Sequence, residues 1–239
     1  MIKKAIILAG GLGTRLRSVI GDLPKPMADI AGRPFLEYLF DYLIRNDVKK
    51  VILSVGYKSA MIINHFGKKY KSIDIEYSME DEPLGTGGAI KKAVGKLKDS
   101  DEFFFVINGD TFFDAPLNKL LEFHYQSNGL ITIAFKSMTD CTRYGSVLID
   151  SSNRIIGFME KGNSKNCLIN GGIYIINIEL FKLLNLPDKF SFEKNLLQDY
   201  YDKLPFYGKN FNRYFIDIGV PEDYKRFKNK YKILNHIFK

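Results

Sequence analysis

The first half of the chain alternates short apolar runs, rich in β-forming residues and in one case nearly all apolar, with segments whose apolar residues recur at helical spacing. The apolar runs cover residues 2–8, 51–55, 73–77 and 103–107, and the helical patterns cover residues 34–46, 59–66, 87–97 and 117–127. A strand that is apolar at nearly every position suits a parallel sheet with both faces covered. The repeated strand–helix–strand units therefore predict an α/β fold: a Rossmann-like, mixed and mainly parallel sheet flanked by helices. Ligands bind such sheets beyond the carboxyl ends of the strands.

The second half differs, because four predicted strands follow one another with short turns between them. These strands cover residues 130–136, 145–149, 154–159 and 172–176, and helices are predicted at residues 178–184, 193–201 and 221–231. No repeat, low-complexity tract or Pro/Gly/Ser-rich linker separates the two halves. We therefore expect a single domain over residues 1–239.

Composition excludes several classes of protein. With 35 Lys+Arg against 27 Asp+Glu the formal net charge is +8, but the charges are dispersed and carry no nucleic-acid-binding signature. A basic excess also suits small anionic substrates. No run approaches 18 apolar residues, so neither a membrane span nor a secretion signal is expected. Cys141 and Cys167 are too few for a disulfide framework and lack metal-ligand spacing, so a reducing cytoplasm is the default.

A glycine-rich loop follows the first predicted strand. Leu8 and Ala9 lead into Gly10, Gly11 and Gly13, and Thr14 and Arg15 come next. Closely spaced glycines let backbone N–H groups converge on an anion, and an arginine can grip phosphate oxygens with its planar fork. Leu16 stands where a dinucleotide fingerprint needs a third glycine, and no Walker lysine follows. A plain strand-to-helix turn with an incidental arginine is the alternative interpretation.

Ten residues after Arg15, Lys25 stands between two prolines, which hold it in a stiff, extended segment. The combination G-G-x-G-T-R-L with P-K-P-M resembles the sugar-phosphate nucleotidyltransferase (NDP-sugar pyrophosphorylase) family. The resemblance implies the nucleotide-diphospho-sugar transferase type of α/β fold, with a nucleotide-binding half at about 1–115 and a sugar-phosphate-binding half at about 116–239. It also implies that the glycine loop and Arg15 hold a nucleoside triphosphate and that Lys25 contacts its phosphates.

Further segments match the family's motifs in order along the chain. The resemblance assigns Glu80, Gly85 and Thr86 to base recognition. It assigns two residues, Asp110 and Asp217, to the metal. The residues that it assigns to the sugar phosphate are Asn108, Gly109, Tyr144, Gly145, Glu160, Lys161, Asn170 and Gly171. Single pairs such as Glu160-Lys161 occur by chance in many proteins. The whole ordered series is hard to produce by chance, and it predicts a nucleotidyltransferase.

The chemistry of such an enzyme follows from charge. A sugar 1-phosphate oxygen attacks the α-phosphorus of a nucleoside triphosphate, so the site must position two anions and cancel their charge. Asp110 and Asp217 are expected to hold Mg²⁺ together. Arg15 and Lys25 would stabilise the departing pyrophosphate, and Lys161 would position the attacking phosphate. No general base is required, because a phosphate monoester is ionised near neutral pH.

Glu80 favours guanine among the bases. A carboxylate only accepts hydrogen bonds, and guanine presents two adjacent donors, whereas uracil and thymine present one. The loop sequence after Gly13 and the short chain resemble D-glycero-α-D-manno-heptose 1-phosphate guanylyltransferases, which would make GDP-heptose for surface glycans. Mannose-1-phosphate guanylyltransferases come next, and uridylyl-, thymidylyl- and cytidylyltransferases remain alternatives.

Two other classes of protein compete with this interpretation. A catalytically silent sensor of nucleotide sugars would not need the metal ligands Asp110 and Asp217. An NAD-dependent oxidoreductase needs an acid after its second strand, and residues 51–55 are followed by Gly56, Tyr57 and Lys58. The sequence does not indicate an oligomeric state; a homodimer is the commonest assembly in general.

Overall fold

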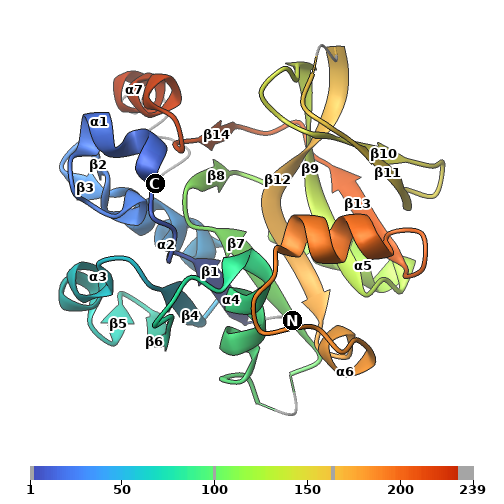
Figure 1. Ribbon diagram of the computed structural model, residues 1–239, viewed down its shortest axis with the longest axis horizontal. Helices are drawn as coiled ribbons and strands as arrows, with labels where there is room; N and C mark the ends of the chain where they lie inside the picture. The colour runs from blue at the N-terminus through green and yellow to red at the C-terminus, as the bar shows by residue number, and fades with distance from the viewer. Residues whose placement is uncertain (1–2, 99–100, 163–164, 231–239) are drawn as a thin grey trace.

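The computed structural model describes residues 3–98, 101–162 and 165–230. A ten-stranded mixed sheet runs through the molecule in the order β11-β10-β12-β7-β1-β4-β6-β5, with β9 paired to β12 and β13 paired to β9. Its parallel centre consists of β7 (Phe103–Asn108), β1 (Lys4–Leu8), β4 (Lys50–Val55) and β6 (Ile73–Met79). Figure 1 shows the blue and teal elements of the first half at the left and the strands β9–β13 of the second half at the right, whereas the red helix α7 returns to lie near α1.

The second half extends the sheet with mainly antiparallel strands. They are β9 (Ile131–Asp140), β10 (Ser146–Ile149), β11 (Ile155–Met159), β12 (Lys165–Asn177) and β13 (Phe206–Asn210). Two small sheets stand apart: β2 (Asp29–Ile30) with β3 (Arg33–Pro34), and β8 (Thr111–Phe113) with β14 (Phe215–Asp217). The last strand, β5 (Lys69–Tyr70), is antiparallel to β6.

Helices cover both faces of the sheet and most of them were predicted. They are α1 (Arg17–Ile20), α2 (Phe35–Arg45), α3 (Ser59–Phe66), α4 (Gly85–Val94), α5 (Leu117–Ser127), α6 (Leu180–Leu183) and α7 (Pro221–Lys230), with 3-10 turns η1 (Thr14–Leu16) and η2 (Lys25–Met27) and the π-helix η3 (Phe192–Gln198). Residues 2 and 231 of the predicted elements lie outside the described residues. The helix expected at 193–201 forms, but as a π-helix and three residues shorter at its end.

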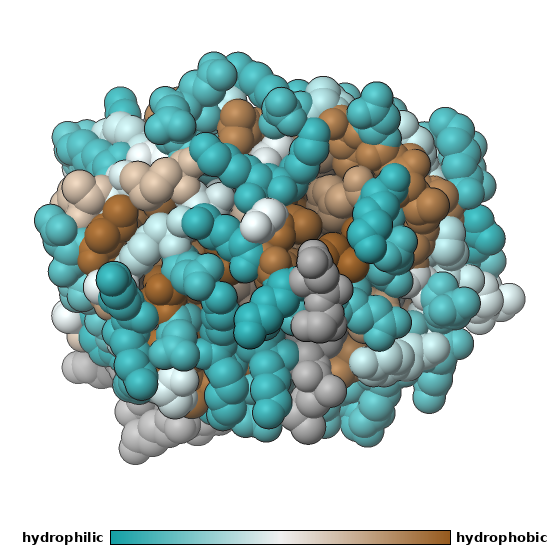
Figure 2. All heavy atoms as spheres, turned by 90° about the horizontal axis from the view of Figure 1, so that it is seen from below, coloured by the Kyte–Doolittle hydropathy of each residue, from teal (hydrophilic) through white to brown (hydrophobic). Residues whose placement is uncertain are grey.

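An apolar cluster covers each face of the sheet, and the predicted strands contribute side chains to both clusters. One cluster gathers α2 side chains such as Leu39 and Leu43 against Ile7 and Val51; the other gathers Ile6 and Ile52 with Tyr174. Alternate residues of β1 and β4 thus face opposite sides of the sheet, which is why these strands are apolar at most positions. Hydrophilic side chains spread over the face in Figure 2, with apolar residues in recesses between them. No described helix is long and apolar enough to cross a bilayer.

The two cysteines, which are too few for a disulfide framework, are joined to each other in the structure. Cys141 follows β9 and Cys167 lies on β12, and the structure forms a disulfide between them with the Cα atoms 6.4 Å apart. The pairing of β9 with β12 sets Cys167 opposite Met138, three residues from Cys141. Spacing along the chain could not reveal this, because the antiparallel register brings the two residues together.

Candidate functional site

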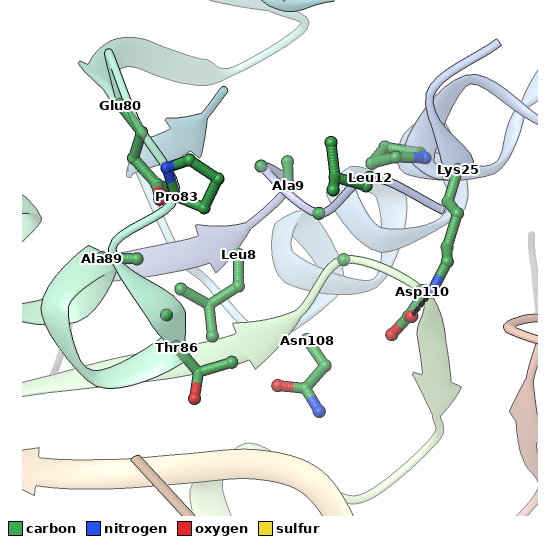
Figure 3. Close-up of a pocket in the computed structure, with 15 residues that line it drawn as sticks. Leu8, Ala9, Leu12, Lys25, Glu80, Pro83, Thr86, Ala89, Asn108 and Asp110 are labelled. Atoms are coloured by element: carbon green, nitrogen blue, oxygen red, sulfur yellow. Dashed lines mark hydrogen bonds and ion pairs between the residues drawn. The ribbon is translucent and has the colours of Figure 1, made fainter. Parts of the chain in front are cut away.

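A cavity of about 330 Å³ lies where β1 and β7 end, at the predicted edge of the parallel sheet (Figure 3). Its lining combines the glycine loop, the start of α4 and the residues after β7: Leu8, Ala9, Gly10, Gly11, Leu12, Lys25, Pro26, Glu80, Pro83, Gly85, Thr86, Ala89, Asn108, Gly109 and Asp110. Most of the residues predicted to bind the nucleotide therefore line one cavity. Asn108 and Gly109, which were predicted for the sugar phosphate, line it too.

The glycine loop leaves no room for side chains at two positions. A Cβ on Gly10 would lie 2.6 Å from Oε1 of Glu80, and a Cβ on Gly13 would lie 2.9 Å from Cγ of Lys25. Gly13 also has a φ of +64°, in the left-handed region that glycine adopts readily. The loop thus packs directly against two of the predicted nucleotide-binding side chains.

Glu80 is held in place by its own neighbours. Its Oε1 accepts a hydrogen bond from Oγ of Ser54 at 2.9 Å, and its Oε2 accepts one from the backbone N–H of Leu84 at 3.2 Å. Ser54 lies on β4 and is fully buried. Both carboxylate oxygens are therefore oriented before any ligand binds, and each still has a lone pair to offer.

Lys25 and Asp110 meet at the other end of the cavity. Nζ of Lys25 lies 2.8 Å from Oδ2 of Asp110, and the two side chains are 15% and 30% exposed. Figure 3 shows Lys25 reaching down to Asp110 from the segment above it. The turn after β7 places the carboxylate, and η2 begins at the lysine.

Asp217 lies beside Asp110, although the two come from opposite halves of the chain. Strand β14 pairs with β8 so that Asp217 is opposite Thr111, the residue after Asp110. A Cβ on Gly219 would contact both carboxylates, at 2.7 Å from Oδ1 of Asp217 and 3.6 Å from Oδ2 of Asp110. Burial and, next, the charge of Asp110 raise the pKa of Asp217. Two adjacent, partly buried carboxylates fit a divalent cation, which would relieve their repulsion.

A second cavity, of about 290 Å³, lies on the sugar-phosphate side predicted from the sequence. It is lined by Arg15, Arg143, Tyr144, Gly145, Lys161, Ile169, Asn170, Asp217 and Val220. Tyr144, Gly145, Lys161 and Asn170 were all expected there. Arg15 was expected beside the triphosphate, and it lines this cavity instead of the first.

Four predicted residues lie outside both linings. Glu160 is exposed, and Gly13 and Thr14 flank the part of the loop that forms the first cavity. Gly171 packs in the interior, where a Cβ would lie 2.4 Å from the ring of Phe113. The assignments of these four residues stay predictions, as do those of the residues that line the two cavities.

Asn170 lines the second cavity, but its side chain makes hydrogen bonds to other residues of the protein. Its Nδ2 donates to Oη of Tyr174 at 2.9 Å, and its Oδ1 accepts from the backbone N–H of Gly172 at 3.0 Å. The side chain therefore shapes the turn on β12 that faces the cavity, besides any contact with a ligand.

Sequence reasoning missed several polar residues that hold the site together. Glu193, on η3, accepts a hydrogen bond from Oγ1 of Thr86 at 2.6 Å, so the second half of the chain fixes the start of α4. Arg143 donates to the buried Asp223 of α7. Arg143 directly precedes Tyr144, which was singled out, and this adjacency was the only signal available in the sequence.

Comparisons with known proteins agree with this site. Residues 4–233 match the family model described as Nucleotidyl transferase. The chain is 49% identical to the D-glycero-alpha-D-manno-heptose 1-phosphate guanylyltransferase of Aneurinibacillus thermoaerophilus, with 93% of this chain and 96% of the relative covered. It is 49% identical to the enzyme of the same name from Campylobacter jejuni, with 94% and 98% covered.

Solved structures agree as well. HddC from Yersinia pseudotuberculosis has 40% identity and a TM-score of 0.87, covering 96% of this chain and all of that one. The same protein complexed with GMP-PN has a TM-score of 0.85 over the same coverage. The family match over nearly the whole chain agrees with two cavities that are lined by one aspartate each, and it leads to one conclusion: this chain belongs to the nucleotidyl transferase family.

Proposed function

We propose that this chain transfers a guanylyl group from GTP to D-glycero-α-D-manno-heptose 1-phosphate, forming GDP-heptose and pyrophosphate. The observation that carries the proposal is the pair Asp110 and Asp217, one lining each cavity, at the place where the two substrates must meet. The 49% identity to two enzymes of this name over nearly their full length supports the choice of substrates.

The reaction exchanges one phosphoanhydride bond for another. An oxygen of the sugar 1-phosphate forms a bond to the α-phosphorus of GTP, and the bond from that phosphorus to the α–β bridging oxygen breaks with its electron pair leaving on pyrophosphate. The attacking oxygen is already anionic near pH 7, so no side chain has to remove a proton. Lys25, which lines the first cavity, would neutralise charge on the triphosphate, and Lys161 and Arg15, which line the second, would hold the phosphate that attacks.

Asp110 and Asp217 would hold Mg²⁺ in this proposal. Their side-by-side carboxylates are the hard oxygen ligands that Mg²⁺ prefers, with phosphate oxygens completing its shell. The bound ion would withdraw charge from the α-phosphate as the new bond forms. Lys25 already neutralises Asp110, so it competes for that carboxylate until the ion binds.

Glu80 is assigned to the guanine base. Its carboxylate lines the first cavity and is fixed by Ser54 and Leu84, so it is pre-oriented to accept from the N1–H and 2-amino groups of guanine. The backbone of the glycine loop and the start of α4 would surround the rest of the nucleotide. The GMP-PN in the related HddC structure supports a guanine nucleotide.

The biological setting remains part of the proposal. We place the enzyme in the cytoplasm, where GTP is available, and its product in surface glycan synthesis. A homodimer is the default assembly for such an enzyme. Neither nucleic acid nor membrane is a partner in this proposal, since the charge is dispersed over the surface.

The test measures pyrophosphate release from GTP, UTP, dTTP and CTP with heptose 1-phosphate, mannose 1-phosphate and glucose 1-phosphate. We expect GTP with heptose 1-phosphate to give the highest kcat/KM. A preference for mannose 1-phosphate would change the sugar and keep the reaction. Binding of GTP without any pyrophosphate release would support the silent sensor and overturn the proposal.

A further inference from the structure

We propose that Arg143 binds the phosphate group of the sugar 1-phosphate, and that the buried Asp223 is the positioning residue that aims it. The inference rests on the proposed function for the identity of the second substrate. It adds to the site a cation that comes from neither the glycine loop nor the Glu160-Lys161 segment.

Arg143 lies in the turn between β9 and β10 and lines the second cavity together with Arg15 and Lys161. Its side chain is 47% exposed, so its charge is accessible from the cavity. The hydrogen bond to Asp223 is the main cause that raises the pKa of Arg143, against the opposing effect of burial, and the charge of Asp217 adds a smaller contribution in the same direction. The guanidinium is therefore within electrostatic reach of the carboxylate proposed to hold the metal.

Asp223 fixes one side of this guanidinium. Its Oδ2 accepts a hydrogen bond from Nη2 of Arg143 at 2.5 Å, while its own side chain is only 4% exposed. In the described part of the chain no hydrogen bond is found from Nε or Nη1 of Arg143. A guanidinium has five N–H donors in a rigid fork, so one edge can hold a carboxylate and another can bind a phosphate.

The net positive charge of the side chains that line the second cavity favours the binding of a dianion. Three cations, Arg15, Arg143 and Lys161, line it with a single carboxylate, Asp217. Asp223 does not cancel this excess, because Arg226 of α7 also pairs with it, at 3.0 Å from Oδ1. A phosphate monoester carries close to two negative charges near pH 7 and would balance the cavity.

A purely structural role for Arg143 is the competing explanation, in which the ion pair only ties the β9–β10 turn to α7. Arg226 provides the matched control, because it pairs with the same carboxylate but does not line the cavity. If the ion pair matters only for packing, Arg143→Met and Arg226→Met should have similar effects. If Arg143 contacts the substrate, only the first variant should affect its use.

The experiment measures kcat and the two KM values for wild type, Arg143→Met, Arg143→Lys, Asp223→Asn and Arg226→Met. We expect Arg143→Met to raise the KM for heptose 1-phosphate about 10- to 100-fold while the KM for GTP changes less than about threefold, since a charge-assisted contact to one substrate is lost. Arg143→Lys should restore part of the affinity. Asp223→Asn should raise the same KM by about three- to tenfold, and Arg226→Met by less than threefold.

Several results would overturn the inference. One is a rise in the KM for GTP alone, which would place Arg143 at the triphosphate. Another is an equal loss in Arg143→Met and Arg226→Met, or a fall in kcat with both KM values unchanged. If Asp223→Asn does not fold, the comparison of Arg143→Met with Arg143→Lys still decides.

Binding measurements separate this inference from the proposed function. Heptose 1-phosphate and mannose 1-phosphate should each raise the unfolding temperature of the wild type, and Arg143→Met should lose most of that shift. If the sugar phosphates cause these shifts but no guanylyl transfer is detected, the phosphate role of Arg143 is supported and the proposed reaction is rejected. Normal transfer with an undiminished shift in Arg143→Met would keep the reaction and reject the phosphate role.

Discussion

Asp110 and Asp217, which line different cavities, lie close together, and Gly219 lies next to both carboxylates. The backbone N–H of Gly219 donates to Oδ1 of Asp217 at 2.7 Å, which holds that carboxylate in position. Lys25 neutralises Asp110 but is not hydrogen-bonded to Asp217 in the described part of the chain. In the proposed reaction a divalent ion would lie between the two carboxylates and relieve their repulsion.

The first prediction concerns this pair. Asp110→Asn and Asp217→Asn should each lower kcat at least ~100-fold, about 2.7 kcal/mol of transition-state stabilisation, because an amide is a poor ligand for Mg²⁺. Both variants should fold, since the shapes are matched. Steady-state assays over a Mg²⁺ titration measure the effect. Asp47→Asn, in an exposed turn after α2, is the control and should keep wild-type turnover. Wild-type kcat in Asp217→Asn at limiting Mg²⁺ would disprove the assignment.

The second prediction concerns Glu80. Wild type should use GTP better than UTP by roughly 30- to 1000-fold in kcat/KM, because uracil leaves part of the carboxylate without a donor. Glu80→Gln should reduce that ratio, since the amide offers one acceptor and adds a donor. Ser54→Ala removes the hydrogen bond to Oε1 of Glu80 but leaves the charge of Glu80, so it should reduce the GTP-to-UTP ratio less than Glu80→Gln does. A wild type that prefers UTP or dTTP would refute the guanine assignment and leave the reaction class intact.

The third prediction concerns His124, which is buried on α5 beside Thr132. Burial lowers the pKa of His124 from 6.5 to about 4, so the folded state resists protonation that the unfolded state accepts. The stabilisation is complete above pH 6.5 and is lost as the pH falls toward 4. The free energy of unfolding should decrease by about 2 kcal/mol between pH 7.5 and pH 5 from this group.

Urea denaturation at the two pH values measures this decrease. His124→Gln removes the titrating ring while keeping a polar side chain, and should show about 2 kcal/mol less pH dependence than wild type. Equal pH dependence in the two proteins would show that His124 is not the responsible group. His65 is exposed and pairs with Glu37, so His65→Gln serves as the control for a surface histidine.

The fourth prediction concerns the disulfide between Cys141 and Cys167. It closes a loop with a sequence separation of 26 and ties the turn that carries Tyr144 to β12. Reduction should lower the free energy of unfolding by about 3 kcal/mol, because the unfolded chain regains conformational freedom. Denaturation with and without dithiothreitol measures the change, and the double variant Cys141→Ser/Cys167→Ser should not respond. In a reducing cytoplasm the bond is expected to be open.

The parallel core was predictable because its pattern is local. Residues 51–55, apart from Ser54, and residues 103–107 are apolar, and they became β4 and β7 with one residue added to each. The helices predicted at 59–66 and 117–127 have the bounds of α3 and α5. Short strands such as β8 and β14 were missed, because three residues carry no periodicity and pair only after the two halves have come together.

For the site, the sequence by itself determined which chemical groups are present. Glycines, Lys25, Glu80 and the two aspartates stand in motifs that need no partner to be recognised. Only the tertiary structure decided which groups share a cavity. Arg15 lines the second cavity and Asn108 lines the first. Arg143, which is hydrogen-bonded to Asp223, lines the second cavity with Arg15. The physical reason is that side-chain direction and strand register follow from packing over the whole chain, whereas a motif records only the order of residues.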